Sequence, residues 1–381
     1  MIDINEMPVY HNFAQETENL FIESAPRLRS LTYYSPGYGF TSYLPCDFLS
    51  HWIQHGAPGN GHLTMKLLGY GPVISGDFRL DIQPSLASME QIEAFLASIQ
   101  HLTLCNHYVG WSSALYHGLI ELDISFYSGF AQLPTTTEFA AILSASPGLR
   151  ALKLHGFGLQ SQDTLNTVEP IRLDYLEVLF LREIHRRSLG LLLPMIWPGT
   201  IPLYMRFNVP KRGVDIVHYA QFLQRSSVVK LMIVGNGLSL PRSILASLAG
   251  VRCLCLCKFI LDVSFWMSMH ESWIPYANEQ YPSVWPSLQI LHLFECAFHI
   301  SEHKRDPKKP IPYNFMWWIW DADQSNEMDS SYVKRGAQNV LGSFSSYVPG
   351  MQEVQEDKSI LLEAWGSALD FAPYSICSAQ S

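Results

Sequence analysis

The sequence predicts an α/β fold built from repeated units, each with one helix and one short strand that runs parallel to its neighbours. Three observations support this prediction. The aliphatic pattern L-x-x-L-x-L recurs along the chain, segments with helical spacing lie between its copies, and Pro or Gly stands at the junctions. The 381 residues are 48% hydrophobic, so they can form a continuous core.

The strands are predicted by seven clear copies of the pattern, in which Ile or Val replaces some of the leucines. Most neighbouring copies lie about 20 to 30 residues apart, close to the length of a leucine-rich repeat. The middle position of the copies is occupied by Leu102, Leu122, Leu152, Leu179, Leu231, Leu254 and Leu291, called the ladder leucines below. Weaker copies lie at 28–33, 62–67, 78–82 and 203–207, and the last of these divides the longest interval.

Two helices are predicted by their caps as well as by their apolar spacing. Ser88 and Gln91 can form a capping box for residues 89–99, and Thr135 and Glu138 can form one for residues 137–144. Residues 46–54, 214–223 and 242–248 repeat the helical spacing without such a box. The predicted unit is therefore a helix, a turn, a short strand and a loop.

These units predict an irregular leucine-rich-repeat solenoid, because one helix and one short strand bury too little apolar surface to fold alone. Parallel strands are expected on the concave face and helices on the convex face. Side chains alternate along a strand, so the ladder leucines should point inward and the residues between them to solvent. The alternative is a doubly wound sheet, whose strands should instead be continuous aliphatic runs.

The chain changes character after residue 302. Residues 303–313 form a charged, proline-rich connector, residues 315–320 are mainly aromatic, and two amphipathic segments follow. We expect residues 1–302 to form the repeat region and residues 303–381 to contain a C-terminal helical cap, because a repeat stack must cover its last core layer. The other interpretation of residues 303–381 is a docking element for a partner.

Charge and composition exclude several classes of partner. Lys and Arg number 25 against 34 Asp and Glu, a net charge of -9, so we expect no nucleic acid. No apolar run approaches the roughly 20 residues that cross a bilayer, and the N-terminus has no signal-peptide pattern. We therefore expect no membrane and a cytoplasmic or nuclear location. Seven scattered cysteines without a CxxC pair predict no disulfide framework, no zinc cluster and no cofactor.

The repeats resemble the leucine-rich-repeat region of fungal F-box-like proteins, particularly those of basidiomycetes. The segments SAPRLRSL, SASPGLRALKL, PIRLDYLEVLFL and WPSLQILHL carry this resemblance, which covers roughly residues 20 to 300. It implies a target-binding subunit of an SCF-type ubiquitin ligase, in which an F-box docks on the Skp adaptor and a cullin completes the assembly. Residues 1–24 contain no Leu-Pro-x-Glu-like F-box start, so we expect either a chain truncated relative to this family or one that does not bind the adaptor directly.

The strand residues between the ladder leucines are the predicted contact surface for a protein target. Half of this concave face is polar and half is expected to be an exposed apolar strip. Its residues are His101, Thr103, Glu121, Asp123, Ala151, Lys153, Val178, Phe180, Tyr204, Arg206, Lys230, Met232, Cys253, Cys255, Ile290 and His292. Alternatively, the C-terminal segment or a loop covers the strip, or a register error of one residue exchanges the two faces.

Several segments contain residue types that also occur in chemical sites. Cys253, Cys255 and Cys257 alternate, which suits either a soft-metal or redox patch or, as we expect, small surface residues. Cys296, His299 and His303 have ligand-like spacing but are expected to lie in a loop. The glycine-rich residues 56–62 precede a strand, so they predict a helix-terminating turn and not a phosphate loop.

The sequence thus predicts a non-catalytic protein-recognition module, the target-binding repeat region of an F-box-type substrate adaptor. The alternative is a leucine-rich-repeat scaffold unrelated to ubiquitin ligation. An enzyme is a third hypothesis, but no nucleophile elbow, HExxH helix or Walker A loop occurs. Glu121 and Asp123 are interpreted as contact or solubility charges and not as an acid–base pair.

Overall fold

The computed structural model gives the fold of most of the predicted repeat region. It describes residues 23, 27–35, 52–53, 63–69, 88–126, 133–160, 169–209, 216–238, 240, 242–262, 287–288, 290–294 and 296–299. The predicted C-terminal cap (303–381), the boundary at residue 302 and the weak repeat at 78–82 lie outside these residues.

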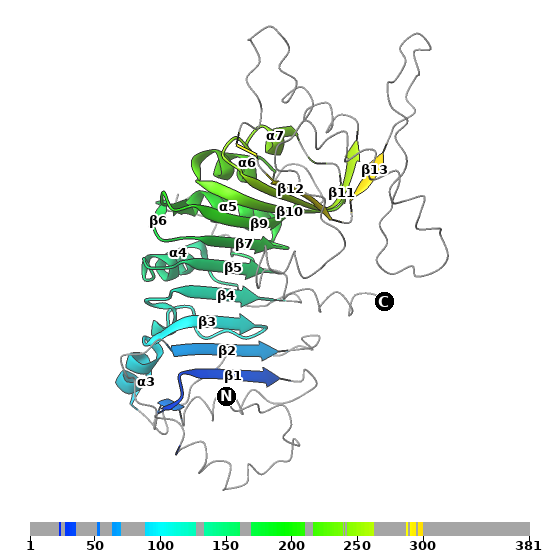
Figure 1. The fold of residues 1–381 in the computed structure, drawn as a ribbon. Coiled ribbons are helices and arrows are strands. Elements are labelled where there is room, and N and C mark those ends of the chain that lie inside the picture. The colour runs from blue at the N-terminus through cyan, green and yellow to red at the C-terminus, as the bar shows by residue number, and fades with distance from the viewer. Residues whose placement is uncertain are drawn as a thin grey trace, which may run out of the picture.

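The described residues form a mixed α/β fold dominated by one parallel sheet. Its strands lie side by side in the order in which they occur in the sequence, as Figure 1 shows. Every pair between them is parallel. They are β1 (Ser30–Ser35), β2 (Leu63–Gly69), β3 (Ile99–Cys105), β4 (Glu121–Ser125), β5 (Ala151–His155), β7 (Val178–Arg182), β9 (Leu203–Asn208), β10 (Val228–Leu238), β11 (Cys253–Asp262) and β12 (Ile290–Phe294).

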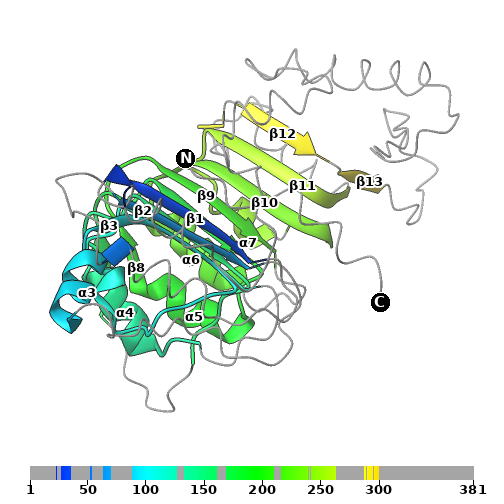
Figure 2. The same cartoon turned by 90° about the horizontal axis from the view of Figure 1, so that it is seen from below.

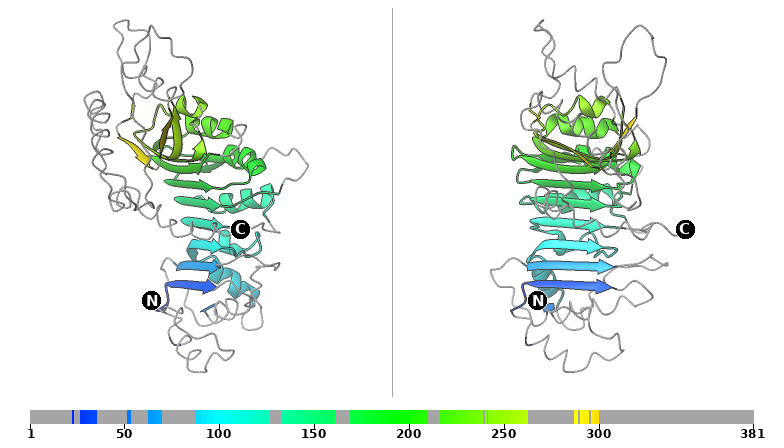
Figure 3. Two further views of the ribbon diagram at one scale, coloured as in Figure 1. Left: turned by 90° about the vertical axis from the view of Figure 1, so that its right-hand side faces the viewer. Right: turned by 45° about the vertical axis from the view of Figure 1, so that its right-hand side comes forward.

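The helices lie on one side of this sheet, as seen from below in Figure 2 and from the side in Figure 3. They are α3 (Met89–Leu96), the 3-10 helix η3 (Ala114–Tyr116), α4 (Thr136–Ser144), α5 (Arg186–Met195), α6 (Ile216–Arg225) and α7 (Arg242–Leu245). β6 (Ile171–Leu173) and β8 (Ile196–Pro198) form a separate two-stranded parallel sheet, and β13 (Ala297–His299) pairs with the end of β11. None of the described helices is long and apolar enough to cross a membrane.

The α/β class and the parallel strands are therefore confirmed. The doubly wound alternative does not fit the described residues, because their helices lie on one side of the sheet and the strand order never reverses.

The ladder leucines form the core between the sheet and the helices, as predicted. Strand register places Leu102 beside Leu122, Leu122 beside Leu152, and Leu152 beside Leu179. The described ladder leucines, from Leu102 to Leu254, are no more than 1% exposed. Burying a Leu side chain contributes about 2 kcal/mol, so this row stabilises the stack strongly.

Both predicted capping boxes are present. The backbone N–H of Gln91 donates to the Ser88 hydroxyl oxygen (3.2 Å), and the Ser88 N–H donates to Gln91 Oε1 (3.0 Å). Thr135 and Glu138 make the same reciprocal pair at 3.1 and 2.8 Å. Each box satisfies two N–H groups that a helix end leaves without partners.

Other predictions need correction or extension. Of the three residues expected in a loop, His299 instead lies in β13, because its backbone pairs with Asp262 of β11. Cys296 lies outside the strands, and His303 lies outside the described residues. α5 was not predicted, since His185 makes no side-chain cap and Pro194 lies inside the helix. The Arg225 guanidinium of α6 donates to the carbonyls of Leu193 and Ile196, and so holds the end of α5.

A left-handed residue follows three of the strands. Asn106 (φ 53°), Gly156 (φ 59°) and Glu183 (φ 52°) come directly after β3, β5 and β7. The Asn106 N–H donates to the carbonyl of Ser125 (2.8 Å), and the Gly156 N–H donates to that of Arg182 (2.9 Å). The chain thus leaves β3, β5 and β7 through a left-handed residue, and after β3 and β5 the N–H of that residue bonds to the next strand in the sheet.

Gly156→Ala should lower the free energy of unfolding by about 3 kcal/mol or more. A left-handed backbone costs about 1–2 kcal/mol for a residue with a Cβ, and overpacking adds about as much again. A Cβ at Gly156 would lie 1.8 Å from the Phe126 carbonyl oxygen, so the backbone must move. Urea unfolding of the full chain measures this loss.

Gly118→Ala is the matched control for this prediction. Gly118 is also left-handed (φ 66°), but a Cβ there would meet nothing within 4 Å. Gly118→Ala should lower the free energy of unfolding by only about 1–2 kcal/mol, the cost of a left-handed backbone for a residue with a Cβ. Equal losses in the two variants would contradict the close approach at Gly156.

Candidate functional site

The face of the large sheet opposite the ladder leucines, called the second face below, carries the predicted contact residues. None of the described helices covers it (Figure 2). Strand register arranges its side chains in rows that cross the sheet. One row contains His101, Glu121, Ala151, Val178, Tyr204, Lys230, Cys253 and Ile290. The next contains Thr103, Asp123, Lys153, Phe180, Arg206, Met232, Cys255 and His292.

The polar half of the second face, on β3 to β5, is held by ion pairs. Lys153 Nζ lies 2.6 Å from Glu121 Oε1, and His101 Nδ1 lies 3.4 Å from Glu121 Oε2. These three side chains come from three adjacent strands, so one carboxylate joins β3, β4 and β5. The Lys153 side chain is only 17% exposed, which limits screening of this pair by solvent and salt.

The two carboxyl groups of β4 have opposite pKa shifts. Burial, the largest influence on Glu121, would raise its pKa, but the hydrogen bond and charge of Lys153, helped by His101, lower it overall. Asp123 is 6% exposed, and burial raises its pKa to about 6 against the attraction of Lys153. Glu121 therefore supplies the stable negative charge, while Asp123 titrates close to neutral pH.

Five side chains in the apolar half of the second face are buried, which corrects the prediction of an exposed strip there, while Val178 and Tyr204 are partly exposed. Phe180, Met232, Cys253, Cys255 and Cys257 are 0–9% exposed and form a cluster separate from the leucine core. The prediction that the three cysteines are surface residues is wrong for the same reason. The cysteine side chains of β11 lie between larger side chains on the adjacent strands. The sequence of β11 alone does not show which residues those neighbours are.

Aromatic contacts join the two halves. Phe180 on β7 packs edge-to-face against Tyr204 on β9, with ring centroids 5.3 Å apart. Lys153 Nζ lies 6.0 Å from the centre of the Phe180 ring, so the lysine that pairs with Glu121 also touches the apolar half. For Ile290 the structure gives only the backbone pairing, beside Cys253.

A third row on the second face was missed by the sequence analysis. It includes Ser125 and His155, paired side by side, and Arg182 beside His155. His155 Nε2 lies 3.3 Å from Glu183 Oε2. In each strand the repeat pattern ends at an aliphatic residue two positions after the ladder leucine. The next residue points to the second face, so extending the alternation of side chains by one position predicts this row.

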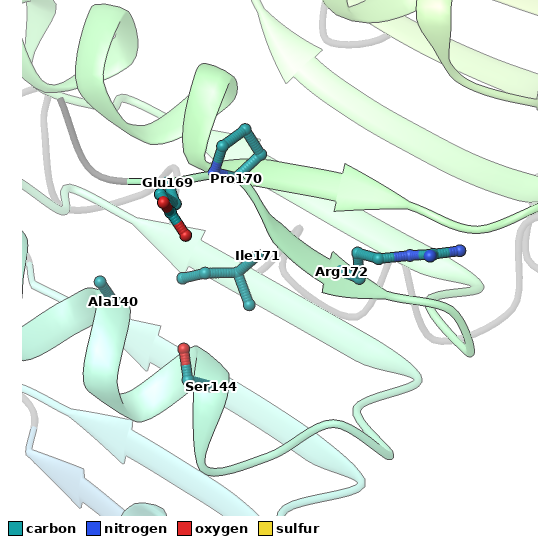
Figure 4. Close-up of a pocket in the computed structure, with 6 residues that line it drawn as sticks. All are labelled: Ala140, Ser144, Glu169, Pro170, Ile171 and Arg172. Carbon is teal, nitrogen blue, oxygen red and sulfur yellow. The ribbon is translucent and has the colours of Figure 1, made fainter.

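A hollow on the helix side is the other candidate site. It has a volume of about 410 Å³ between α4 and β6, and its lining residues are Ala140, Ser144, Glu169, Pro170, Ile171 and Arg172. Figure 4 shows the Ile171 side chain directed toward α4 and the Arg172 guanidinium directed away from the hollow. Arg172 instead approaches Asp174, at 3.5 Å. The polar groups do not converge on one point, which makes the hollow a weaker candidate than the second face.

Metal-ligating side chains are scattered over the described residues. Within them, no three His, Cys, Asp or Glu side chains are arranged to hold a metal ion. The Cys296 Sγ, part of the ligand-like string, donates to the carbonyl of Leu256 at 3.2 Å. The thiol therefore stabilises the backbone of β11 in this structure.

Comparison of the chain with protein-family models and with curated proteins finds no match.

Asp123→Asn should remove a pH-dependent loss of stability. The carboxyl has a pKa of about 6 in the folded chain against an ordinary value of 3.8, so the folded state holds the proton more tightly. The contribution of Asp123 to stability is therefore largest below about pH 4, and about 3 kcal/mol of it is lost as pH rises from 4 through 6. Urea unfolding of wild type and variant from pH 4 to 7 measures the difference.

Asp174→Asn is the control for this prediction, because Asp174 is an exposed carboxyl outside the second face. Its stability profile should keep the wild-type fall between pH 4 and 6. If the Asp123→Asn profile instead ran parallel to that of wild type, ionisation of Asp123 would not be the cause.

Proposed function

We propose that the described repeats form an irregular leucine-rich-repeat solenoid. Three features support this architecture: the sequential strand order, the helices on one side, and the aligned ladder leucines. The recurring left-handed turn after β3, β5 and β7 adds a fourth feature, since a stack of equivalent units repeats its turns as well as its core.

The function that this geometry supports best is non-catalytic protein recognition by the second face. The observation that carries the proposal is the set of side-chain rows that cross adjacent parallel strands without a covering helix. A wide surface of aligned side chains suits an extended or folded protein partner better than a small molecule. The ion pairs of Glu121 hold the polar half in one arrangement before a partner arrives.

Catalysis has less support on this surface. The Glu121 carboxylate is engaged by Lys153 and His101, and Asp123 is buried, so neither lies in a closed cleft with room for a substrate. We therefore propose a binding protein, located in the cytoplasm or nucleus.

We further propose that the partner is a ubiquitylation target and the chain the target-binding part of an F-box-type adaptor. The support is the resemblance of residues 20–300 to fungal F-box-like repeats. An interaction scaffold outside the ubiquitin system uses the same surface and is the competing proposal.

Ala151→Arg should weaken target binding by about tenfold or more. Ala151 lies between Glu121 and Val178 in one row of the second face, so a long cationic side chain there blocks the centre of the surface. Tagged full-length chain, expressed in a basidiomycete, is captured and its partners are quantified by mass spectrometry. A partner specific to the second face should fall about tenfold or more, the effect of losing about 1.4 kcal/mol.

Gln221→Arg is the matched control, because it adds the same side chain at an exposed position of α6 on the helix side. It should retain every partner of wild type. Equal recovery with Ala151→Arg would overturn the second face as the binding surface.

The same captures separate the ligase from the scaffold proposal. If an F-box is supplied upstream of these residues, the Skp adaptor and a cullin should be recovered with wild type and both variants, because the target surface does not bind them. Their absence from captures that do contain a target would favour the scaffold.

A further inference from the structure

Two buried thiols of the second face lie next to each other on β11. The Sγ atoms of Cys255 and Cys257 are 3.6 Å apart, and the residues are 0% and 6% exposed. Two sulfurs bound to one three-coordinate ion at about 2.3 Å each, with the trigonal angle of about 120°, lie about 4.0 Å apart. The observed separation therefore needs only a small adjustment to hold one metal ion between the two sulfurs.

The surroundings of this pair are rich in soft donors. Strand register places Met232 of β10 directly beside Cys255, and both belong to the same buried cluster. His292 of β12 lies beside Cys255 on the other side.

A positive charge lies in the same row. Arg206 of β9 is directly beside Met232, and its charge interacts with the thiols of both Cys255 and Cys257. A monovalent ion with two thiolates carries one net negative charge, which would be costly to bury alone. The guanidinium can balance that charge.

We propose that Cys255 and Cys257 form a binding site for one Cu(I) ion, with the Met232 thioether beside them and Arg206 balancing the charge. Thiolate and thioether sulfurs select soft ions such as Cu(I). Cu(I) is stable with two or three sulfur ligands. Zn²⁺ takes four ligands, and the described residues offer no group of three His, Cys, Asp or Glu ligands.

The other cysteines of this region have different positions. Cys253 lies at the start of β11, on the far side of Cys255 from Cys257, and Cys296 donates to the Leu256 carbonyl. The proposed site therefore uses one pair, with a stoichiometry of one ion per chain.

Binding is an exchange of protons for metal and involves no electron transfer. Two S–H bonds break, two Cu–S bonds form, and two protons pass to solvent. Affinity should accordingly increase with pH.

Titration of the reduced full-length chain with Cu(I) tests the proposal. The chain carries no histidine tag, oxygen is excluded, and a chromogenic Cu(I) chelator competes for the ion. Wild type should bind one Cu(I) with release of two protons. Cys255→Ser and Cys257→Ser should each weaken binding about 100-fold or more, because each removes half of the thiolate ligands.

Cys105→Ser is the matched control. Cys105 is also a buried cysteine of the second face, but it lies on β3, far from β11 in the sheet order. It should keep wild-type affinity. Equal weakening in all three serine variants, or full binding in Cys255→Ser and Cys257→Ser, would overturn the site.

X-ray absorption at the copper edge of the wild-type complex provides a readout that does not depend on the folding of any variant. Two or three sulfur neighbours are expected in the first coordination shell. A first shell of nitrogen and oxygen alone would show that the copper sits elsewhere.

Discussion

The constraint on which this structure depends is the alternation of side chains along parallel strands whose leucines align. Once Leu122, Leu152 and Leu179 occupy one buried row, each intervening residue must lie on the opposite face, in register with its neighbours. Helices then cover only the leucine side (Figure 2). The second face is thus a direct consequence of how the core is built, and its composition can vary without changing the fold.

The variation along the second face follows from which residues adjacent strands place side by side. Parallel strands lie about 4.8 Å apart, so a charge on one strand interacts mainly with the next. Glu121 meets a lysine and a histidine, which produces an ion-paired region on β3 to β5. Further along the sheet, Met232 lies beside Cys255, and the same pairing of adjacent strands produces a buried cluster that contains sulfur side chains.

The sequence predicted the features that depend on neighbours in the chain. Ser88 with Gln91, and Thr135 with Glu138, are capping boxes because the interacting groups are three residues apart. The ladder leucines were predicted because the L-x-x-L-x-L pattern spans only six residues and can be recognised within one strand. α5 was missed because its start has no capping side chain, and the Arg225 contact that holds its end comes from a different helix. The burial of Cys255 was missed for a similar reason, since Met232 and His292 reach it only through strand pairing.

The two halves of the second face differ in what they can contribute to a complex. Burial stabilises an association only for surface that is exposed beforehand, and Phe180, Met232 and Cys255 are already withdrawn from water. A partner therefore gains contact energy mainly from half-exposed groups such as His101, Glu121 and Ala151. Because ion pairs already order two of these, their side chains lose little entropy on binding. The buried cluster instead packs against β7, β10 and β11, so the proposed recognition surface and the proposed metal site occupy separate parts of one sheet.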